Sequence, residues 1–267
     1  MFMASHLVNG VRYYYEERGS GDQVIFFGHG LMYHWRIFEP QMEYFAAKGF
    51  RCIAIDWRGQ GQTEGGGTLD DYSMYRLGAD AYQLLSDLGI KRVHWVGVSM
   101  GGMIGLRLYP KHPELFLSFT LIDSSAGDAP ELLDGYRQMG DAYLAYGLIP
   151  PLQEGLDAVF YTPKMAERHP QVLAYWHAYW TNADRESLYK AIIPVIDRDD
   201  VTDTISQIAV PTLIVVGVED MSTPPAKSEA MQQLIANAQL RYIDDASHMS
   251  ILEQPEAITA AMAEFIG

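Results

Sequence analysis

Short apolar runs alternate along the chain with amphipathic stretches of ten or more residues. The apolar runs end in Gly or Asp, and several are too continuously apolar to have one face in water, which is typical of central strands in a mostly parallel sheet. Because amphipathic stretches follow most of these runs, the pattern predicts an α/β fold with helices flanking the sheet. The expected strands are residues 11–16, 23–27, 51–55, 93–97, 116–122, 212–217 and 239–243, and the expected helices are residues 35–47, 72–88, 100–109, 225–235 and 255–265.

The alternation breaks between residues 124 and 196. This stretch is rich in Tyr and Trp, holds several Pro residues and contains no convincing buried strand. A crossover between parallel strands needs only about a dozen residues, so the segment is too long to be a simple connection. We therefore expect a core domain of residues 1–123 and 197–267, with a helical cap, or lid, of residues 124–196 inserted into it.

One part of the expected cap has a distinct aromatic pattern. Residues 171–180 place their aromatic side chains at three- and four-residue spacings, which gathers them on one face of a helix. That face either packs onto the core or lines a small-molecule pocket, since such pockets usually have apolar and aromatic walls. The sequence leaves both interpretations open.

Composition and charge exclude several classes of protein. The 267 residues carry a net charge of −15, which repels nucleic-acid phosphates and anionic lipid surfaces. No window approaches the roughly 18 apolar residues of a membrane span, and the first residues lack a basic stretch followed by an apolar core. Cys52, the one cysteine, lies in an apolar run and is expected to be a buried strand residue. We expect a cytoplasmic protein that binds neither nucleic acid nor membranes.

The strongest local motif is G-x-S-x-G at residues 97–101, between an expected strand and an expected helix. A sharp strand-to-helix turn of this kind holds the serine in a strained backbone conformation, and its glycines let neighbouring chain pass close by. The turn also places Ser99 at a helix N-terminus, where free N–H groups favour developing negative charge. The motif therefore predicts that Ser99 is a nucleophile.

A serine hydroxyl needs a base that a third group orients, and both partners follow downstream. Asp220 comes after the expected strand at 212–217, and His248 comes after the expected strand at 239–243, just before the last helix. Each of the three residues thus falls in a loop at the carboxyl end of a strand, and their order along the chain is that of α/β-hydrolases. We predict a triad of Ser99, His248 and Asp220.

Other candidates for these roles are present. Asp123 ends the strand after the nucleophile helix and could orient His248 in place of Asp220, whereas Glu219 is expected to point elsewhere on its loop. Among the eight histidines His248 alone has the right position, and His29 is expected to be a structural hydrogen-bond partner. The histidine spacings match no common metal motif, so no metal site is expected.

Outside the cap, the chain resembles the α/β-hydrolase superfamily from about residue 11 to residue 265. The segment FGHGL at 27–31 resembles the oxyanion loop of that family, and DWRGQG at 56–61 resembles its D-x-R-G-x-G loop. A finer similarity, to 3-oxoadipate enol-lactonases and related small esterases, rests on the segments GVSMGGM at 97–103, TPP at 223–225 and HMSILEQP at 248–255.

The resemblance implies further roles and a reaction. The backbone N–H groups of Leu31 and Met100 would form the oxyanion hole, where donors meet the charge of a tetrahedral intermediate. Because the nucleophile is a serine, the implied chemistry is acyl transfer through an acyl-enzyme. We therefore expect a serine hydrolase of a small carboxylic ester or lactone that needs no cofactor, and a homo-oligomer is compatible with the sequence.

The substrate and some alternative functions stay open. An enol-lactonase substrate carries a carboxylate that needs a basic anchor, but residues 124–199 hold six basic against eleven acidic side chains. The net negative charge of this segment therefore favours a neutral ester or lactone. The same framework would also fit a cofactor-free perhydrolase of the haloperoxidase type, a carbon–carbon bond hydrolase, or a ligand receptor with slow turnover.

Overall fold

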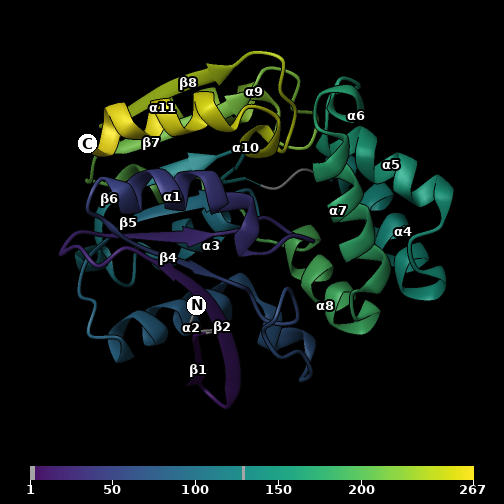
Figure 1. Cartoon of the computed structure of the whole chain (residues 1–267), viewed down its shortest axis with the longest axis horizontal. Helices are drawn as coiled ribbons and strands as arrows, with labels where there is room; N and C mark the ends of the chain where they lie inside the picture. The colour runs from purple at the N-terminus through teal and green to yellow at the C-terminus, as the bar shows by residue number, and fades with distance from the viewer. Residues whose placement is uncertain (1–3, 128–129) are drawn as a thin grey trace.

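The structure is a computed structural model that describes residues 4–127 and 130–267. Its centre is an eight-stranded sheet in the order β1-β2-β4-β3-β5-β6-β7-β8 (Figure 1). Strand β2 runs antiparallel to both of its neighbours, and the remaining pairs are parallel. The strands are β1 (Ala4–Val8), β2 (Val11–Arg18), β3 (Val24–Gly28), β4 (Arg51–Ile55), β5 (Val93–Val98), β6 (Phe116–Ile122), β7 (Thr212–Gly217) and β8 (Ala238–Ile243).

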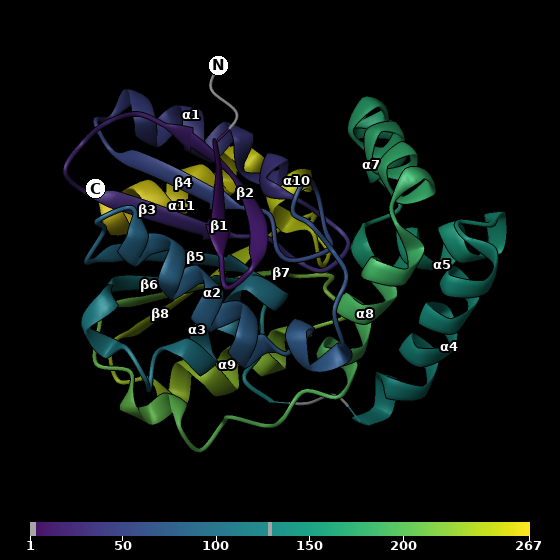
Figure 2. The ribbon, with the colours of Figure 1, turned by 90° about the horizontal axis from the view of Figure 1, so that it is seen from below.

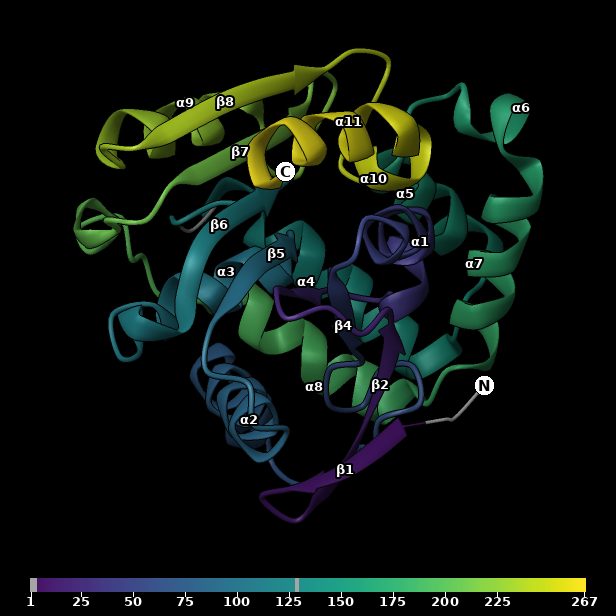
Figure 3. The same ribbon diagram turned by 60° about the vertical axis from the view of Figure 1, so that its left-hand side comes forward.

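Helices cover both faces of this sheet (Figure 3). On one face lie α1 (Glu39–Ala47) and α11 (Pro255–Ile266), and on the other lie α2 (Met74–Asp87), α3 (Met100–Leu108) and α9 (Pro225–Leu234). Short helical turns complete the connections: η1 (Trp35–Phe38), η2 (Leu69–Tyr72), η3 (Pro113–Leu115), η4 (Ile205–Gln207) and α10 (Ser250–Glu253).

Alternate residues of the central strands pack into two hydrophobic clusters, one on each face of the sheet. In β3, Ile25 and Phe27 pack on the side of α1, whereas Val24 and Phe26 pack on the side of α2 and α3. Because successive strand side chains point to opposite faces, a strand covered on both sides is apolar throughout, as the sequence predicted. Cys52 in β4 is fully buried, as expected.

Five α-helices of the described chain lie between β6 and β7 and gather on one side of the molecule, beyond the end of the sheet (Figures 1 and 2). They are α4 (Pro130–Tyr146), α5 (Pro150–Phe160), α6 (Met165–Arg168), α7 (Pro170–Asn182) and α8 (Arg185–Ile196). We call residues 124–196 the cap and the rest of the chain the core, which is our interpretation of this arrangement. Among the described helices, none combines the length and the apolar character needed to cross a membrane.

The aromatic face of α7 packs onto the core through its two tryptophans. Trp176 and Trp180 are buried, and their rings meet that of Tyr33 edge-on, at centroid distances of 4.7 and 5.7 Å. Edge-to-face contacts of this kind stabilise a buried aromatic cluster. The cap is therefore fixed to the core through a hydrophobic contact next to the loop that follows β3.

Candidate active site

The turn after β5 has the strained geometry that its glycines predict. Ser99 adopts a positive φ of 48°, and its N–H donates a hydrogen bond to the carbonyl of Ile122 at 2.8 Å. A Cβ atom on Gly101 would lie only 1.9 Å from the carbonyl oxygen of Gly28, and one on Gly97 would also collide with backbone. Glycine is therefore required at both positions, and the tight packing holds the turn in place.

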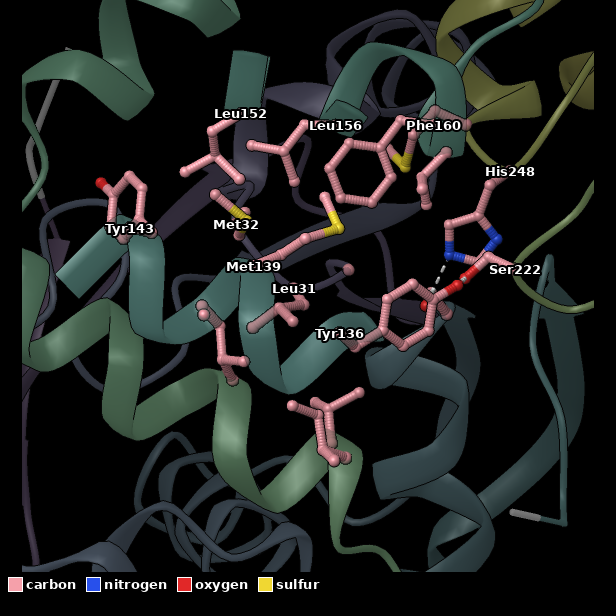
Figure 4. Close-up of a pocket in the computed structure, with 18 residues that line it drawn as sticks. Leu31, Met32, Tyr136, Met139, Tyr143, Leu152, Leu156, Phe160, Ser222 and His248 are labelled. Carbon is pink, nitrogen blue, oxygen red and sulfur yellow. Dashed lines mark hydrogen bonds between the residues drawn. The ribbon is translucent and has the colours of Figure 1, made fainter. Parts of the chain in front are cut away.

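Ser99, His248 and Asp220 come together at the carboxyl end of the sheet. The Nε2 atom of His248 lies 3.0 Å from the Ser99 Oγ (Figure 4). Its Nδ1 atom lies 3.0 and 3.1 Å from the two carboxylate oxygens of Asp220. All three side chains are buried. This is the hydrogen-bond order in which an imidazole takes a proton from a serine while a carboxylate fixes its tautomer.

The loop after β7 holds Asp220 in a fixed orientation. Its Oδ1 atom accepts the backbone N–H groups of Ser222 at 2.8 Å and Thr223 at 2.9 Å, and its Oδ2 atom accepts the Thr223 hydroxyl at 2.7 Å. Since carboxylates are stabilised by such donors, Asp220 stays ionised although it is buried.

The charges of this pair shift both pKa values. Burial disfavours the imidazolium of His248, but the neighbouring Asp220 carboxylate more than offsets it, so the pKa of His248 is raised. Burial likewise disfavours the Asp220 carboxylate, but attraction to His248 and the hydrogen bonds outweigh it, and the pKa of Asp220 is lowered. The site thus favours a positive imidazole beside a negative carboxylate, which is the state reached after proton transfer from serine.

Asp123, the other candidate acid, holds loops together instead of contacting His248. Its carboxyl group accepts the N–H of Gly217 at 2.9 Å, and the N–H and hydroxyl of Ser250 at 3.1 and 2.6 Å. Burial, together with the negative charge of Asp220, raises the pKa of Asp123 to about 8. The geometry therefore favours Asp220 as the partner of His248, while Asp123 joins the start of the loop after β7 to the start of α10.

The two predicted oxyanion donors belong to segments next to Ser99. Met100 is the first residue of α3, and Leu31 lies in the loop after β3 and lines the cavity beside Ser99. Within residues 4–127 and 130–267, no hydrogen bond is found from either backbone N–H. Both donors are therefore available to a ligand, as an oxyanion hole requires.

His29 has a structural role, as expected. Its Nε2 atom accepts the backbone N–H of Trp57 at 2.9 Å, and its Nδ1 atom lies 2.7 Å from the carbonyl oxygen of Gly30. Burial lowers the pKa of His29 to about 3, so the ring is neutral at physiological pH. A neutral ring with one donor and one acceptor suits both contacts, and it ties the loop after β3 to the loop after β4.

A cavity of about 90 Å³ opens from Ser99 and His248 into the space between core and cap (Figure 4). A single water molecule needs about 10–15 Å³ on this scale, so the cavity has room for several non-hydrogen atoms. Apart from His248, none of the described residues that line it has an ionisable acid or base other than tyrosine. Most of its wall is aliphatic or aromatic, as shown by Met139, Leu152, Leu156, Phe160, Ile192 and Val195.

Sequence reasoning did not identify these cavity residues of α4, α5 and α8. Of the aromatic cap residues, Tyr136, Tyr143 and Phe160 line the cavity, whereas Tyr146 is 71% exposed. Amphipathic spacing marked these segments as helical, but it does not tell which apolar face meets a ligand and which meets the core. No group of three or more His, Cys, Asp or Glu side chains that could hold a metal ion occurs in the part of the chain that the structure describes.

Comparisons with known proteins place the chain in a family. A family model described as the alpha/beta hydrolase fold matches residues 23–255, so the chain belongs to the α/β-hydrolase family. It is 31% identical to 3-oxoadipate enol-lactonase 1 of Acinetobacter baylyi, over 91% of this chain and 88% of that protein. It is 27% identical to a non-heme haloperoxidase of Rhodococcus erythropolis, over 97% of each chain. A solved esterase from Thermogutta terrifontis superposes with a TM-score of 0.89 at 25% identity, covering 100% of this chain and 98% of that one.

Proposed function

We propose that this hydrolase-family protein is a serine esterase that cleaves a small neutral carboxylic ester or lactone. The observation that carries the proposal is the buried chain of hydrogen bonds from Ser99 through His248 to Asp220, at the wall of an apolar cavity. Relatives named as an enol-lactonase and an esterase support the same class of reaction.

In the proposed mechanism, the Ser99 Oγ attacks the substrate carbonyl while His248 Nε2, 3.0 Å away, takes its proton. The Asp220 carboxylate stabilises the imidazolium that forms. The N–H groups of Leu31 and Met100 hold the negative oxygen of the tetrahedral intermediate. When the intermediate collapses, His248 protonates the leaving alcohol, and a water activated by the same histidine then releases the acid.

The walls of the cavity support a neutral substrate. A carboxylate buried without a cation or donors is strongly disfavoured, and the described lining residues include no Lys or Arg. The described cavity lining therefore lacks the cation that a negatively charged enol-lactone would need, although a protein named as an enol-lactonase is among the relatives of this chain. A short apolar acyl group fits both the size and the lining of the cavity.

The test is steady-state hydrolysis of p-nitrophenyl acetate, butyrate and octanoate. Wild-type protein should cleave the short esters, and Ser99→Ala, His248→Ala and Asp220→Asn should each lower kcat by about 10⁴-fold or more. Ser86→Ala, an exposed serine on α2, is the matched control and should keep full activity. Activity that survives Ser99→Ala would contradict the mechanism, and no activity in wild type would contradict the function.

The relative named as a haloperoxidase supports a second candidate function, that of a perhydrolase. If hydrogen peroxide replaced water at the acyl-enzyme, the product would be a peracid, which oxidises bromide. Peroxide-dependent bromination in acetate buffer measures this activity. We expect it to be slower than ester hydrolysis at equal substrate concentration, and a faster bromination would favour the perhydrolase.

A further inference from the structure

The loop that carries Leu31 is a tight turn with an unfavourable residue at its third position. The N–H of Tyr33 donates a hydrogen bond to the carbonyl of Gly30 at 3.3 Å, which closes a four-residue turn. Met32, at the third position, has a φ of 67°. This is the type II form, which favours glycine at that position because a side chain is strained at positive φ. A methionine there must be held by contacts from outside the turn.

Two buried hydrogen bonds supply these contacts. The N–H of Met32 donates to the Oε1 atom of Gln60, in the loop after β4, at 2.7 Å. The indole N–H of Trp180, in cap helix α7, donates to the carbonyl oxygen of Met32, also at 2.7 Å. All three residues are at most 3% exposed. The peptide groups before and after Met32 are therefore each fixed by a separate side chain.

The turn lies directly against the nucleophile. A Cβ atom on Gly30 would lie 3.5 Å from that of Ser99, and Gly30, Leu31 and Met32 all line the cavity. Types I and II of this turn differ by a flip of the central peptide, here the one that joins Leu31 to Met32. A flip would break the bond to Gln60 and reorient the backbone next to the Leu31 N–H.

We propose that Gln60 and Trp180 are positioning residues that keep the Gly30–Tyr33 turn in its type II form and thereby hold the Leu31 N–H in place for the oxyanion. This inference rests on the proposed serine-esterase function. Because Trp180 belongs to cap helix α7, the cap would help to position the oxyanion donor as well as to line the cavity.

Oxyanion donors act mainly on the transition state, so the kinetic signature is a loss in kcat with little change in KM. Gln60→Met removes the acceptor at similar length, and Trp180→Phe removes the donor but keeps a ring. We expect each to lower kcat for p-nitrophenyl butyrate 10- to 100-fold, with KM within about threefold of wild type. Gln60→Glu, which retains an acceptor oxygen, should recover part of the loss.

A glycine at position 32 separates the proposed role from simple packing. Glycine adopts positive φ without strain, so in a Met32→Gly background the loss caused by Gln60→Met should shrink to about threefold or less. Met32→Ala, which enlarges the cavity almost as much but keeps a Cβ atom, is the control for lost volume. An equal loss in both backgrounds would overturn the proposal.

Matched controls and a second probe complete the experiment. Gln62→Met changes an exposed glutamine of the same loop, and Trp176→Phe changes a buried indole of the same helix that donates no hydrogen bond to Met32; both should keep kcat. Butylboronic acid, which forms a tetrahedral adduct with an active serine, should bind Gln60→Met and Trp180→Phe more weakly by the same factor as the loss in kcat. If wild type neither cleaves esters nor binds the boronic acid, the proposed function fails; if wild type does both and the variants match it, this inference alone fails.

Discussion

Glu253, at the end of α10, accepts hydrogen bonds from both the N–H and the hydroxyl of Thr162 in the cap, at 2.9 and 2.6 Å. Its second carboxylate oxygen accepts the N–H of Ser247, the residue before His248, at 2.7 Å. One buried carboxylate thus connects the cap with the loop that carries the proposed base.

Glu253→Ala should destabilise the protein, because it leaves three buried donors without an acceptor. We expect the free energy of unfolding to fall by about 2–4 kcal/mol in urea titrations. Ester hydrolysis should also fall, by about tenfold, since Ser247 no longer fixes the position of His248. Glu256→Ala, an exposed glutamate at the start of α11, is the control. A loss below about 1 kcal/mol would show that the connection contributes little.

The pH profile of activity should report the pKa of His248. A general base must be neutral in the free enzyme, and the Asp220 carboxylate raises the pKa of His248 above 6.5. The rising limb of kcat/KM for p-nitrophenyl butyrate should therefore have its midpoint above pH 6.5. In Asp220→Asn the midpoint of the residual activity should move to lower pH, because the Asp220 carboxylate no longer opposes the lowering of the His248 pKa by burial. The exposed Asp203→Asn should leave the midpoint unchanged. A wild-type midpoint at or below 6.5 would contradict this assignment.

Stability should fall as pH rises from 6.5 to 8.5. Burial raises the pKa of Asp56 to about 7 and that of Asp123 to about 8, so the folded state holds protons that the unfolded state has released. The raised pKa of His248 acts in the same direction. His29 and His34, whose pKa values burial lowers to about 3 and about 4, oppose this trend only below about pH 6.5.

Asp123→Asn tests that pH dependence, because asparagine has no proton to release. Urea unfolding at pH 6.5 and 8.5 should show a decline smaller by about 1–2 kcal/mol in Asp123→Asn than in wild type. The exposed Asp87→Asn serves as the control and should decline like wild type. Parallel curves for Asp123→Asn and wild type would mean that Asp123 does not carry the effect.

An acyl chain that ends in a carboxylate should be a poor substrate. We compare mono-p-nitrophenyl succinate with p-nitrophenyl butyrate, and use methyl p-nitrophenyl succinate as a neutral control for size. With no Lys or Arg among the described lining residues, kcat/KM for the charged ester should be at least about 100-fold lower than for its methyl ester. A difference below tenfold would mean that a cation reaches the bound acyl group.

The far end of the cavity should set the preference for chain length. Leu152, on α5, points into the cavity well away from His248 (Figure 4). Leu152→Ala should raise the ratio of octanoate to butyrate kcat/KM about tenfold, at a stability cost of about 2–3 kcal/mol. Leu69→Ala, which truncates an exposed leucine outside the cap, should leave the ratio unchanged. An unchanged ratio in Leu152→Ala would place the acyl chain elsewhere.

The buried strands could be predicted because their pattern is local. Three expected strands, 51–55, 116–122 and 212–217, match β4, β6 and β7 residue for residue. Strand β1 was missed, since a short edge strand with exposed Leu7 carries no apolar run. The expected helix at 35–47 is divided into η1 and α1, because Pro40 in the first turn of α1 starts a new helix.

The proposed triad could also be predicted, because each member follows a strand that the pattern reveals. The residues that hold it could not. Gln60 and Trp180 are separated by 120 positions, and nothing in their spacing predicts that both bind Met32. The positive φ of Met32 could not be predicted from the sequence either, since such a turn is ordinarily marked by a glycine or an asparagine.

The indole hydrogen bond from α7 means that the cap and the core of this protein cannot be exchanged independently of each other. A cap inserted between two strands invites exchange with the cap of a relative, in order to transfer substrate preference from one protein to another. Here such a graft would also remove the donor that holds the carbonyl of Met32. A chimera with a new cap therefore needs either another hydrogen-bond donor for that carbonyl or a glycine at position 32. Only then should it gain the new substrate preference and keep its kcat.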